Sequence, residues 1–415
     1  MITPIVYAIP FFLALIGIEL YFAWRMGRKV YRTQDAVTSL SIGTMSQFVL
    51  AFGKVATIGI YALMVEKFGT FSFDTGNPLV WIGALVLYDF FYYWNHRAGH
   101  EVNLLWAAHV AHHNSEEYNL TTALRQSSTS FLYNWIFYLP MALLGIPLKV
   151  FVVAGLIDLL YQFWVHTQLI PKMGWWDRVF VMPSNHRVHH GQNDYCIDKN
   201  YGGIWIVWDR LFGTFAEERD DEPVVYGVRK PLASWNPMWS NLQTYAGIAQ
   251  RVLATRGWNN KLMRVFAGPA WEPPGTPATP TFQAAAFVRY DTPASRWLRL
   301  YGVLAMTAGI AFIVHFLVVN TGLPVASRTA YAALMVVSLM CLGMVWSGKR
   351  WVLAVEIVRA ALVFGAILAG VWFAPVTPLA QAAAGLALLA TLALLTMAMM
   401  DSKTPVHSRS SPVNA

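Results

Sequence analysis

Histidine is the residue whose spacing in this sequence could do chemistry. The chain has 11 histidines, and 9 of them fall between His96 and His190. All of these except His166 belong to three clusters: an HxxxH pair at His96–His100 and two HxxHH triads at His109–His113 and His186–His190. Residues three and four apart share one face of a helix, so we expect each cluster to present its imidazoles to one point. This arrangement is typical of a metal site.

The number and type of these side chains indicate which metal they would hold. Nine imidazoles exceed what one ion can bind, so we expect about two ions. Imidazole without thiolate suits iron, zinc, copper or nickel, whereas a structural zinc needs only about four ligands, usually including cysteine. Iron beneath apolar helices is what oxidation of a lipid C–H bond would require, because water must be kept from reactive intermediates. The predicted ligands are His96, His100, His109, His112, His113, His166, His186, His189 and His190.

Carboxylates share helix faces with two of these histidine groups. Asp89 lies on one face with His96, and Asp158 lies on another with His166. Metal-bound histidines usually donate their second N–H to a carboxylate or a carbonyl, so we predict catalytic roles for Asp89 and Asp158. Asp89 could instead tie two spans together. The two histidines outside the cluster region fit a packed polar residue (His315) and a solvated one (His407).

The composition predicts the setting of this site. Hydrophobic residues make up 56% of the 415-residue chain and charged residues 13%, against about 25% charged residues in ordinary soluble proteins. The formal charge of +8 could suggest nucleic-acid binding, but much of it borders apolar segments, as the positive-inside rule predicts. We therefore expect a polytopic membrane protein with no nucleic-acid partner.

The apolar segments predict an all-α membrane bundle of about seven spans and one helical hairpin. Arg25, Arg28 and Lys29 follow the first segment, which lacks signal-peptide features and is expected to be a retained span. Placing this basic cluster in the cytoplasm puts all three histidine clusters in a cytoplasmic di-metal cap. The expected spans are Pro4–Trp24, Thr44–Val65, Leu79–Trp94 and segments near 298–319, 329–347, 351–373 and 378–399, and the hairpin is 131–165.

The same pattern predicts the domain organisation. Residues 171–296 are too polar to span and are expected to be irregular, ending in a proline-rich linker that contains Pro277 and Pro280. We expect N-terminal spans at 1–78, a histidine-cluster catalytic region at 79–268, the linker at 269–296, C-terminal membrane helices at 297–400 and a polar tail at 401–415.

At the histidine clusters, the chain resembles the fatty acid hydroxylase/sterol desaturase superfamily, whose three boxes are HxxxH, HxxHH and HxxHH. Residues 198–202 and 208–214 are similar to a further block of that superfamily. Within it, the stretches 113–119, 122–127, 162–167 and 190–193 most resemble the alkylglycerol monooxygenases. The resemblance covers roughly residues 80–216. Asn185 departs from relatives that have a histidine there, so the expected ligand count stays at nine.

The resemblance implies two iron ions, dioxygen as co-substrate, tetrahydrobiopterin as reductant, and oxidative cleavage of glycerol ether lipids. The carbon beside the ether oxygen would be hydroxylated, releasing a fatty aldehyde and a glycerol derivative. A carboxylate can pair with the donor nitrogens of a pterin, so Glu101 is a candidate for pterin or proton handling, and Glu117 is a second cofactor candidate. Hydroxylation or desaturation of a sterol, fatty acyl or amino-acid-derived lipid is the alternative.

Partners and location follow from what the chain contains. We find no GxGxxG, CxxC or appended haem motif, so electrons are expected from an external donor, and the substrate from the bilayer. A metal transporter or sensor is the non-enzymatic alternative, although the last four spans are almost wholly apolar. The alanine-rich spans and the absence of a KDEL-like ending favour a bacterial inner membrane over the endoplasmic reticulum. The oligomeric state is not predicted.

Overall fold

The computed structural model describes residues 4–276 and 282–401, and side chains within these ranges except those of residues 54–56. Its regular elements are helices, and the described residues contain two isolated β-bridges, Phe180–Trp205 and Gly191–Tyr226, but no strand. The all-α prediction is therefore confirmed. Pro277, Pro280, His407 and the tail beyond Asp401 lie outside the described residues.

Within the described residues, six helices are long and apolar enough to cross a membrane. They are α1 (Pro4–Arg25), the first half of α2 (Thr33–Phe68), α12 (Arg296–Val319), α13 (Val325–Val345), α14 (Arg350–Leu368) and α15 (Pro378–Asp401). This is close to the expected seven spans and a hairpin, and an integral membrane protein follows. The expected third span lies in α3 (Pro78–Glu101), which is not among the six.

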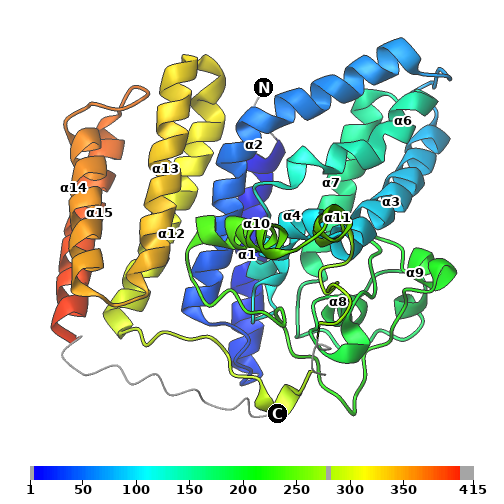
Figure 1. The fold of residues 1–415 in the computed structure, drawn as a ribbon. Coiled ribbons are helices and arrows are strands. Elements are labelled where there is room, and N and C mark those ends of the chain that lie inside the picture. The colour runs from blue at the N-terminus through cyan, green and yellow to red at the C-terminus, as the bar shows by residue number, and fades with distance from the viewer. Residues whose placement is uncertain (1–3, 277–281, 402–415) are drawn as a thin grey trace.

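The second span was predicted too late in the chain. Its apolar window covers Thr33–Gly53, not Thr44–Val65. Asp35, Ser39 and Ser41 are each at most 2% exposed, so their polar groups face protein and not lipid. Because these side chains are polar, the sequence prediction started the span after them. Beyond it, α2 bends and leans across the top of the molecule towards α6 and α3 (Figure 1).

The expected hairpin has one short arm. Its second arm is α7 (Leu148–Trp164), but its first arm consists of the 3-10 helices η1 (Ser130–Leu132) and η2 (Asn134–Tyr138) and the short helix α6 (Leu139–Leu144), with η2 and α6 continuous over Asn134–Leu144. Gly145 turns the chain with a φ of +90°, a conformation that glycine adopts readily. The first arm is therefore too short to span, and it lines a cavity described below.

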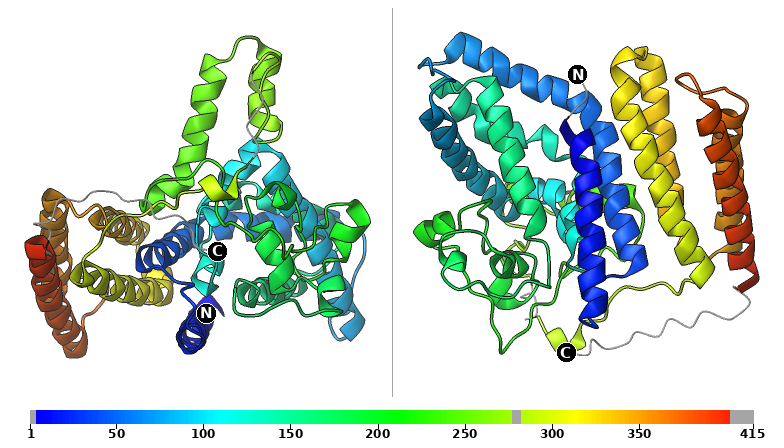
Figure 2. Two further views of the ribbon diagram at one scale, coloured as in Figure 1. Left: turned by 90° about the horizontal axis from the view of Figure 1, so that it is seen from below. Right: turned by 180° about the vertical axis from the view of Figure 1, so that it is seen from behind.

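The C-terminal helices α12–α15 stand as a bundle beside the region that contains the histidine clusters (Figure 2). Their core includes Leu298, Leu342 and Trp346, and α12 packs against α2. Inside this bundle, Arg359 donates to Glu356 from two nitrogens, at 2.6 and 2.7 Å, so the two charges compensate each other.

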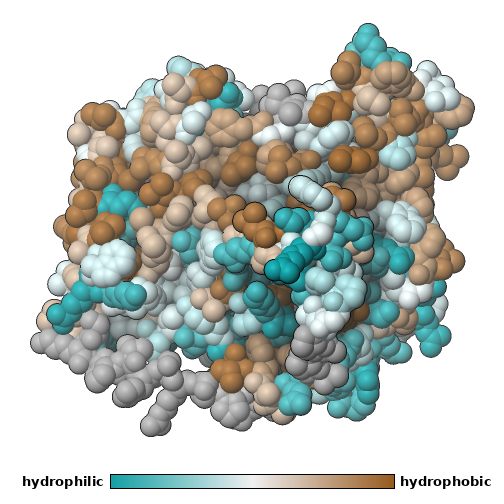
Figure 3. Space-filling model, in the orientation of Figure 1, coloured by the Kyte–Doolittle hydropathy of each residue, from teal (hydrophilic) through white to brown (hydrophobic). Residues whose placement is uncertain are grey.

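The polar region 171–296 contains more helix than we expected from its sequence. Its long elements are α10 (Pro237–Ala254) and α11 (Trp258–Phe266), whereas α4 (Asn103–His113), the helix of the second histidine cluster, precedes it. Apolar side chains dominate the upper half of the surface and polar ones the lower half (Figure 3). The short elements are α5 (Leu120–Ala123), η3 (Trp176–Arg178), α8 (Pro183–His189), η4 (Asp194–Cys196), α9 (Val207–Phe212), η5 (Ala284–Ala286) and η6 (Asn320–Gly322).

Candidate metal centre

The structure brings all nine predicted histidines together, in two groups. Within each group, one nitrogen from every ring lies within 4.8 Å of the others, a spacing that could hold a metal ion. The groups adjoin, because the rings of His113 and His190 stack with centroids 4.3 Å apart. The first group is His96, His100, His109, His113 and His189, and the second is His112, His166, His186 and His190.

Each HxxHH triad is divided between the two groups, which differs from our expectation that a cluster points to one place. In α4, His109 and His113 join the first group and His112 joins the second. In the triad of α8, His189 joins the first group while the other two join the second. Adjacent helix residues point about 100° apart, so neighbouring histidines can face two different ions.

Backbone carbonyls orient several of these rings. The Nδ1 atom of His96 lies 2.8 Å from the carbonyl of Tyr201, and that of His166 lies 2.7 Å from the carbonyl of Gln162. Two more rings are held in the same way, His112 by the carbonyl of Arg125 and His189 by that of Lys199. A ring that donates Nδ1–H to a carbonyl presents a bare Nε2, which is the form that binds a metal.

The electrostatic setting keeps the rings neutral. His186, His189 and His190 are each at most 4% exposed, and burial holds their pKa values well below the usual value for histidine. Burial also lowers the pKa of His112 to about 4. Neutral imidazole is the ligand form, so the site is prepared for metal at neutral pH.

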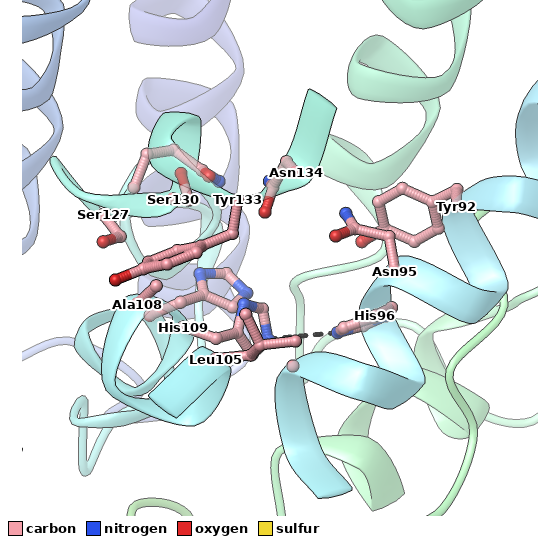
Figure 4. A pocket seen from close by; sticks show the side chains of 13 residues that line it. Tyr92, Asn95, His96, Leu105, Ala108, His109, Ser127, Ser130, Tyr133 and Asn134 are labelled. Carbon is pink, nitrogen blue, oxygen red and sulfur yellow. Dashed lines mark hydrogen bonds between the residues drawn. The ribbon is translucent and has the colours of Figure 1, made fainter. Parts of the chain in front are cut away.

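A large apolar cavity adjoins the histidines. It has a volume of about 650 Å³ and extends from His109, His112 and His166 to apolar side chains of α1, α2, α7 and α12. A smaller pocket of about 100 Å³, called the neck below, shares part of its lining and borders His96, His109 and His112. In Figure 4, the carboxamides of Asn95 and Asn134 face the space above His109 from opposite sides.

Comparison with known proteins agrees with this geometry. Residues 81–214 match the model of the family described as fatty acid hydroxylase. The chain is 40% identical to alkylglycerol monooxygenase of Homo sapiens over 311 residues, which cover 74% of this chain and 69% of that protein. It is 36% identical to alkylglycerol monooxygenase of Xenopus tropicalis over 356 residues, covering 85% and 79%.

The chain belongs to the alkylglycerol monooxygenase family. It is a member of the fatty acid hydroxylase superfamily, as the histidine boxes indicated. A third relative, alkylglycerol monooxygenase of Danio rerio, is 43% identical over 64% of this chain and 59% of its own length. No solved structure matches the chain. These relatives come from animals, so they give no support to our expectation of a bacterial inner membrane.

The segment matched by the fatty acid hydroxylase superfamily runs from α3 to α9 and contains all nine histidines. A family of lipid-hydroxylating monooxygenases does not fit our alternative of a metal transporter or sensor. Members of this family are oxidoreductases, so the histidine groups are the candidate catalytic centre.

The predicted carboxylates lie around this centre and not inside either group. Asp89 is fully buried and accepts hydrogen bonds from the amide of Ile204 at 2.6 Å and the indole of Trp208 at 2.7 Å. Asp158 lines the large cavity and accepts a hydrogen bond from Gln162. Asp89 thus ties α3 to the segment before α9, and the catalytic roles of both carboxylates stay predictions.

The two cofactor candidates have other partners. Glu101 pairs with Arg97 at 2.9 Å and lies 3.5 Å from the hydroxyl of Tyr201. Glu117 is buried and pairs with Arg32 at 2.6 Å and Arg289 at 2.9 Å. Burial raises the pKa of Glu117 to about 7. Neither residue lines either cavity.

Sequence reasoning missed the residues that hold these histidines in place. The guanidinium of Arg125 is buried and donates to the carbonyl of Ala111 at 2.7 Å, while its own carbonyl holds His112. Asn185, where the resemblance led us to consider a tenth histidine, accepts from the amide of Met182 at the start of α8. It belongs to neither histidine group. The one available signal was the position of Arg125 in a stretch resembling the family.

Proposed function

We propose that the chain is a di-iron lipid monooxygenase that hydroxylates the carbon next to the ether oxygen of an alkylglycerol. One oxygen atom of O₂ enters the C–H bond, and the other leaves as water with electrons from an external donor. The hydroxylated carbon forms a hemiacetal, which collapses to a fatty aldehyde and a glycerol derivative. The names of the relatives support this substrate class.

The observation that carries the proposal is that several nitrogens of the buried imidazoles lack a hydrogen-bond partner. Four of their nitrogens have no partner among the described residues, namely Nε2 of His100, His189 and His190 and Nδ1 of His186. Unpaired buried polar atoms are costly, and metal coordination would satisfy several of them. The nine histidines would hold two iron ions, which when bound supply activation of dioxygen.

The shape of the large cavity supports a lipid with a single polar end. Its far part is lined by apolar residues such as Ile9, Leu13 and Ile313, which suit an alkyl chain. Near His109, the lining residues Asn95, Ser130 and Asn134 make no side-chain hydrogen bond within the described ranges, and amides and hydroxyls can both donate to and accept from glycerol hydroxyls. A glycerol headgroup in this neck would place the ether carbon beside the histidines.

Tetrahydrobiopterin is the proposed reductant, and Glu101 is proposed to bind it. The carboxylate is about 39% exposed at the edge of the histidine centre, so a soluble cofactor can reach it. Glu101→Gln should raise the KM for tetrahydrobiopterin and leave the iron content unchanged. Unaltered pterin dependence would refute this role. Glu117 already pairs with two arginines, so its cofactor role stays a prediction.

The catalytic cap is proposed to face the cytoplasm. The C-terminal end of α1, which carries Arg25, and the beginning of α12, which carries Arg296, lie in the lower half of the molecule, as do α8 and α9 (Figure 1). Positive residues near span ends favour the cytoplasmic side.

A substrate panel tests the proposal. Membranes containing the full chain are incubated with tetrahydrobiopterin and with an alkylglycerol, a fatty acyl lipid, an amino-acid-derived lipid or a sterol. Fatty aldehyde release from the alkylglycerol, dependent on pterin, is expected. Oxidation of only the acyl lipid, the amino-acid-derived lipid or the sterol would replace the proposed substrate with the alternative.

A further inference from the structure

Helices α10 and α11 form a hairpin that projects sideways from the molecule (Figure 2). The base of the hairpin is attached near the end of the candidate membrane helix α13 and near the end of α3. A Cβ added to Gly343, near the end of α13, would lie 2.9 Å from Pro237 at the start of α10. At the other end, Asn103, just after α3, donates to the carbonyl of Arg264 at 2.7 Å. The hairpin lies where the apolar surface meets the polar surface (Figure 3).

The outer face of α11 is an exposed apolar stripe. Trp258 is 81% exposed, Leu262 55% and Phe266 58%, and their spacing of four residues places them on one helix face. Leu253, near the end of α10, is 79% exposed. Arg264 lies on the opposite face, where it is buried and paired with Glu272. Such a stripe is unfavourable in water and requires an apolar environment.

The charge of the hairpin indicates what that environment is. Residues 237–268 contain no Asp or Glu, and their basic residues besides Arg264 are Arg251, Arg256 and Lys261. An apolar stripe beside basic residues is the pattern of a helix that lies in an anionic membrane surface. A second copy of the same hairpin would bring like charges together, so a copy of this chain fits the surface poorly.

We propose that this hairpin lies in the headgroup layer of the leaflet that faces the histidine cap and binds anionic lipids there. The stripe of Trp258, Leu262 and Phe266 enters the acyl layer, and the basic residues contact lipid phosphates or carboxylates. Because α10 and α11 pack against α4, this anchoring fixes the height of α4, which carries His109, His112 and His113, above the bilayer. The proposal is independent of the reaction that the centre performs.

Spin-label depth measurements on the full chain in bilayers test the insertion. Nitroxides are attached in turn at Trp258→Cys, Leu262→Cys and Phe266→Cys, and at Asp220→Cys, a control on the polar cap whose side chain is about 91% exposed. Cys196 and Cys341 are buried, and the unsubstituted chain provides the labelling background. Labels on the stripe should be accessible to oxygen and shielded from a water-soluble nickel complex, and the control should show the reverse.

The lipid preference is tested by comparing phosphatidylcholine vesicles with vesicles containing about one third phosphatidylserine. The stripe labels should lie deeper with phosphatidylserine, and Arg256→Gln combined with Lys261→Gln should abolish that difference. Nickel access at all three stripe positions would overturn the proposal. Labels that neither reagent reaches would overturn it in favour of a protein partner, and equal depth in both lipids would overturn the anionic preference.

Discussion

At the scale of single residues, each histidine in the two groups is expected to be needed for metal binding. His100→Gln removes a ring whose Nε2 is buried without a protein partner. We expect iron content to fall and activity to drop by more than about 100-fold, since even changes around metal ligands cost up to that factor. Iron analysis and aldehyde release measure the two effects.

A matched variant separates this loss from general damage. His315 lies in the C-terminal bundle, where its Nδ1 is 2.9 Å from the hydroxyl of Tyr331. His315→Gln should keep its iron and its activity. Equal iron content in the His100 and His315 variants would contradict the assignment of His100 as a ligand.

Asn134 tests the headgroup position. Asn134→Ala should raise the KM for an alkylglycerol by about 3- to 10-fold, because one net hydrogen bond to a neutral group contributes about 0.5–1.5 kcal/mol. An alkyl ether without hydroxyls should show no such increase. An equal effect on both substrates would mean that Asn134 does not contact the headgroup.

At this scale, the convergence of the histidines could be predicted from the sequence, whereas their assignment to two groups and the carbonyls that orient them depend on tertiary structure. The spacing of the histidines predicted which imidazoles converge, because residues three and four apart share a helix face. The division of His112 and His113 between two groups also follows from helix geometry, but assigning each a group requires knowing where His166 and His190 lie. The carbonyls that orient His96 and His189 come from irregular segments whose path the sequence pattern does not specify.

At the scale of elements, close packing between α2 and the end of α5 positions the second histidine group. A Cβ on Gly43 would lie 2.0 Å from the carbonyl oxygen of Leu124, next to the residue whose carbonyl holds His112. Gly43→Ala should therefore destabilise the protein by about 1–3 kcal/mol and reduce iron binding.

Gly59 in the same helix provides the control, because a Cβ there would meet nothing within 4 Å. Gly59→Ala should leave the melting temperature and the iron content close to those of the unsubstituted protein. Similar melting curves for the two alanine variants would show that the contact with Leu124 does not constrain the centre.

The position of a helix could be predicted from hydropathy where the helix has the same kind of surroundings along most of its length. The helices α1 and α12–α15 are apolar over most of their length, even with the Glu356–Arg359 pair in α14, so hydropathy placed them close to where they lie. The start of α2 was missed because its polar residues face protein. In α11, the apolar positions recur every four residues, but we treated the whole region 171–296 as irregular because its average composition is polar.

At the scale of the whole molecule, the metal ions should stabilise the fold. Removing them leaves buried imidazoles in both groups without partners, so chelation should lower the melting temperature, and added ferrous iron should restore it. A ligand at 100 times its Kd stabilises by about 2.7 kcal/mol per site. Thermal unfolding in detergent, with and without a chelator, measures the change, and an unchanged melting temperature would indicate that the groups hold no tightly bound metal.

Iron stoichiometry of the purified full-length protein is the most direct measurement of whether the two histidine groups form a di-iron centre. We expect about two iron ions per chain. We also expect a clear loss from substitution in either group, with His189→Gln representing the first and His186→Gln the second. A chain that carries no tightly bound iron, or that holds zinc or copper in its place, would contradict the di-iron centre.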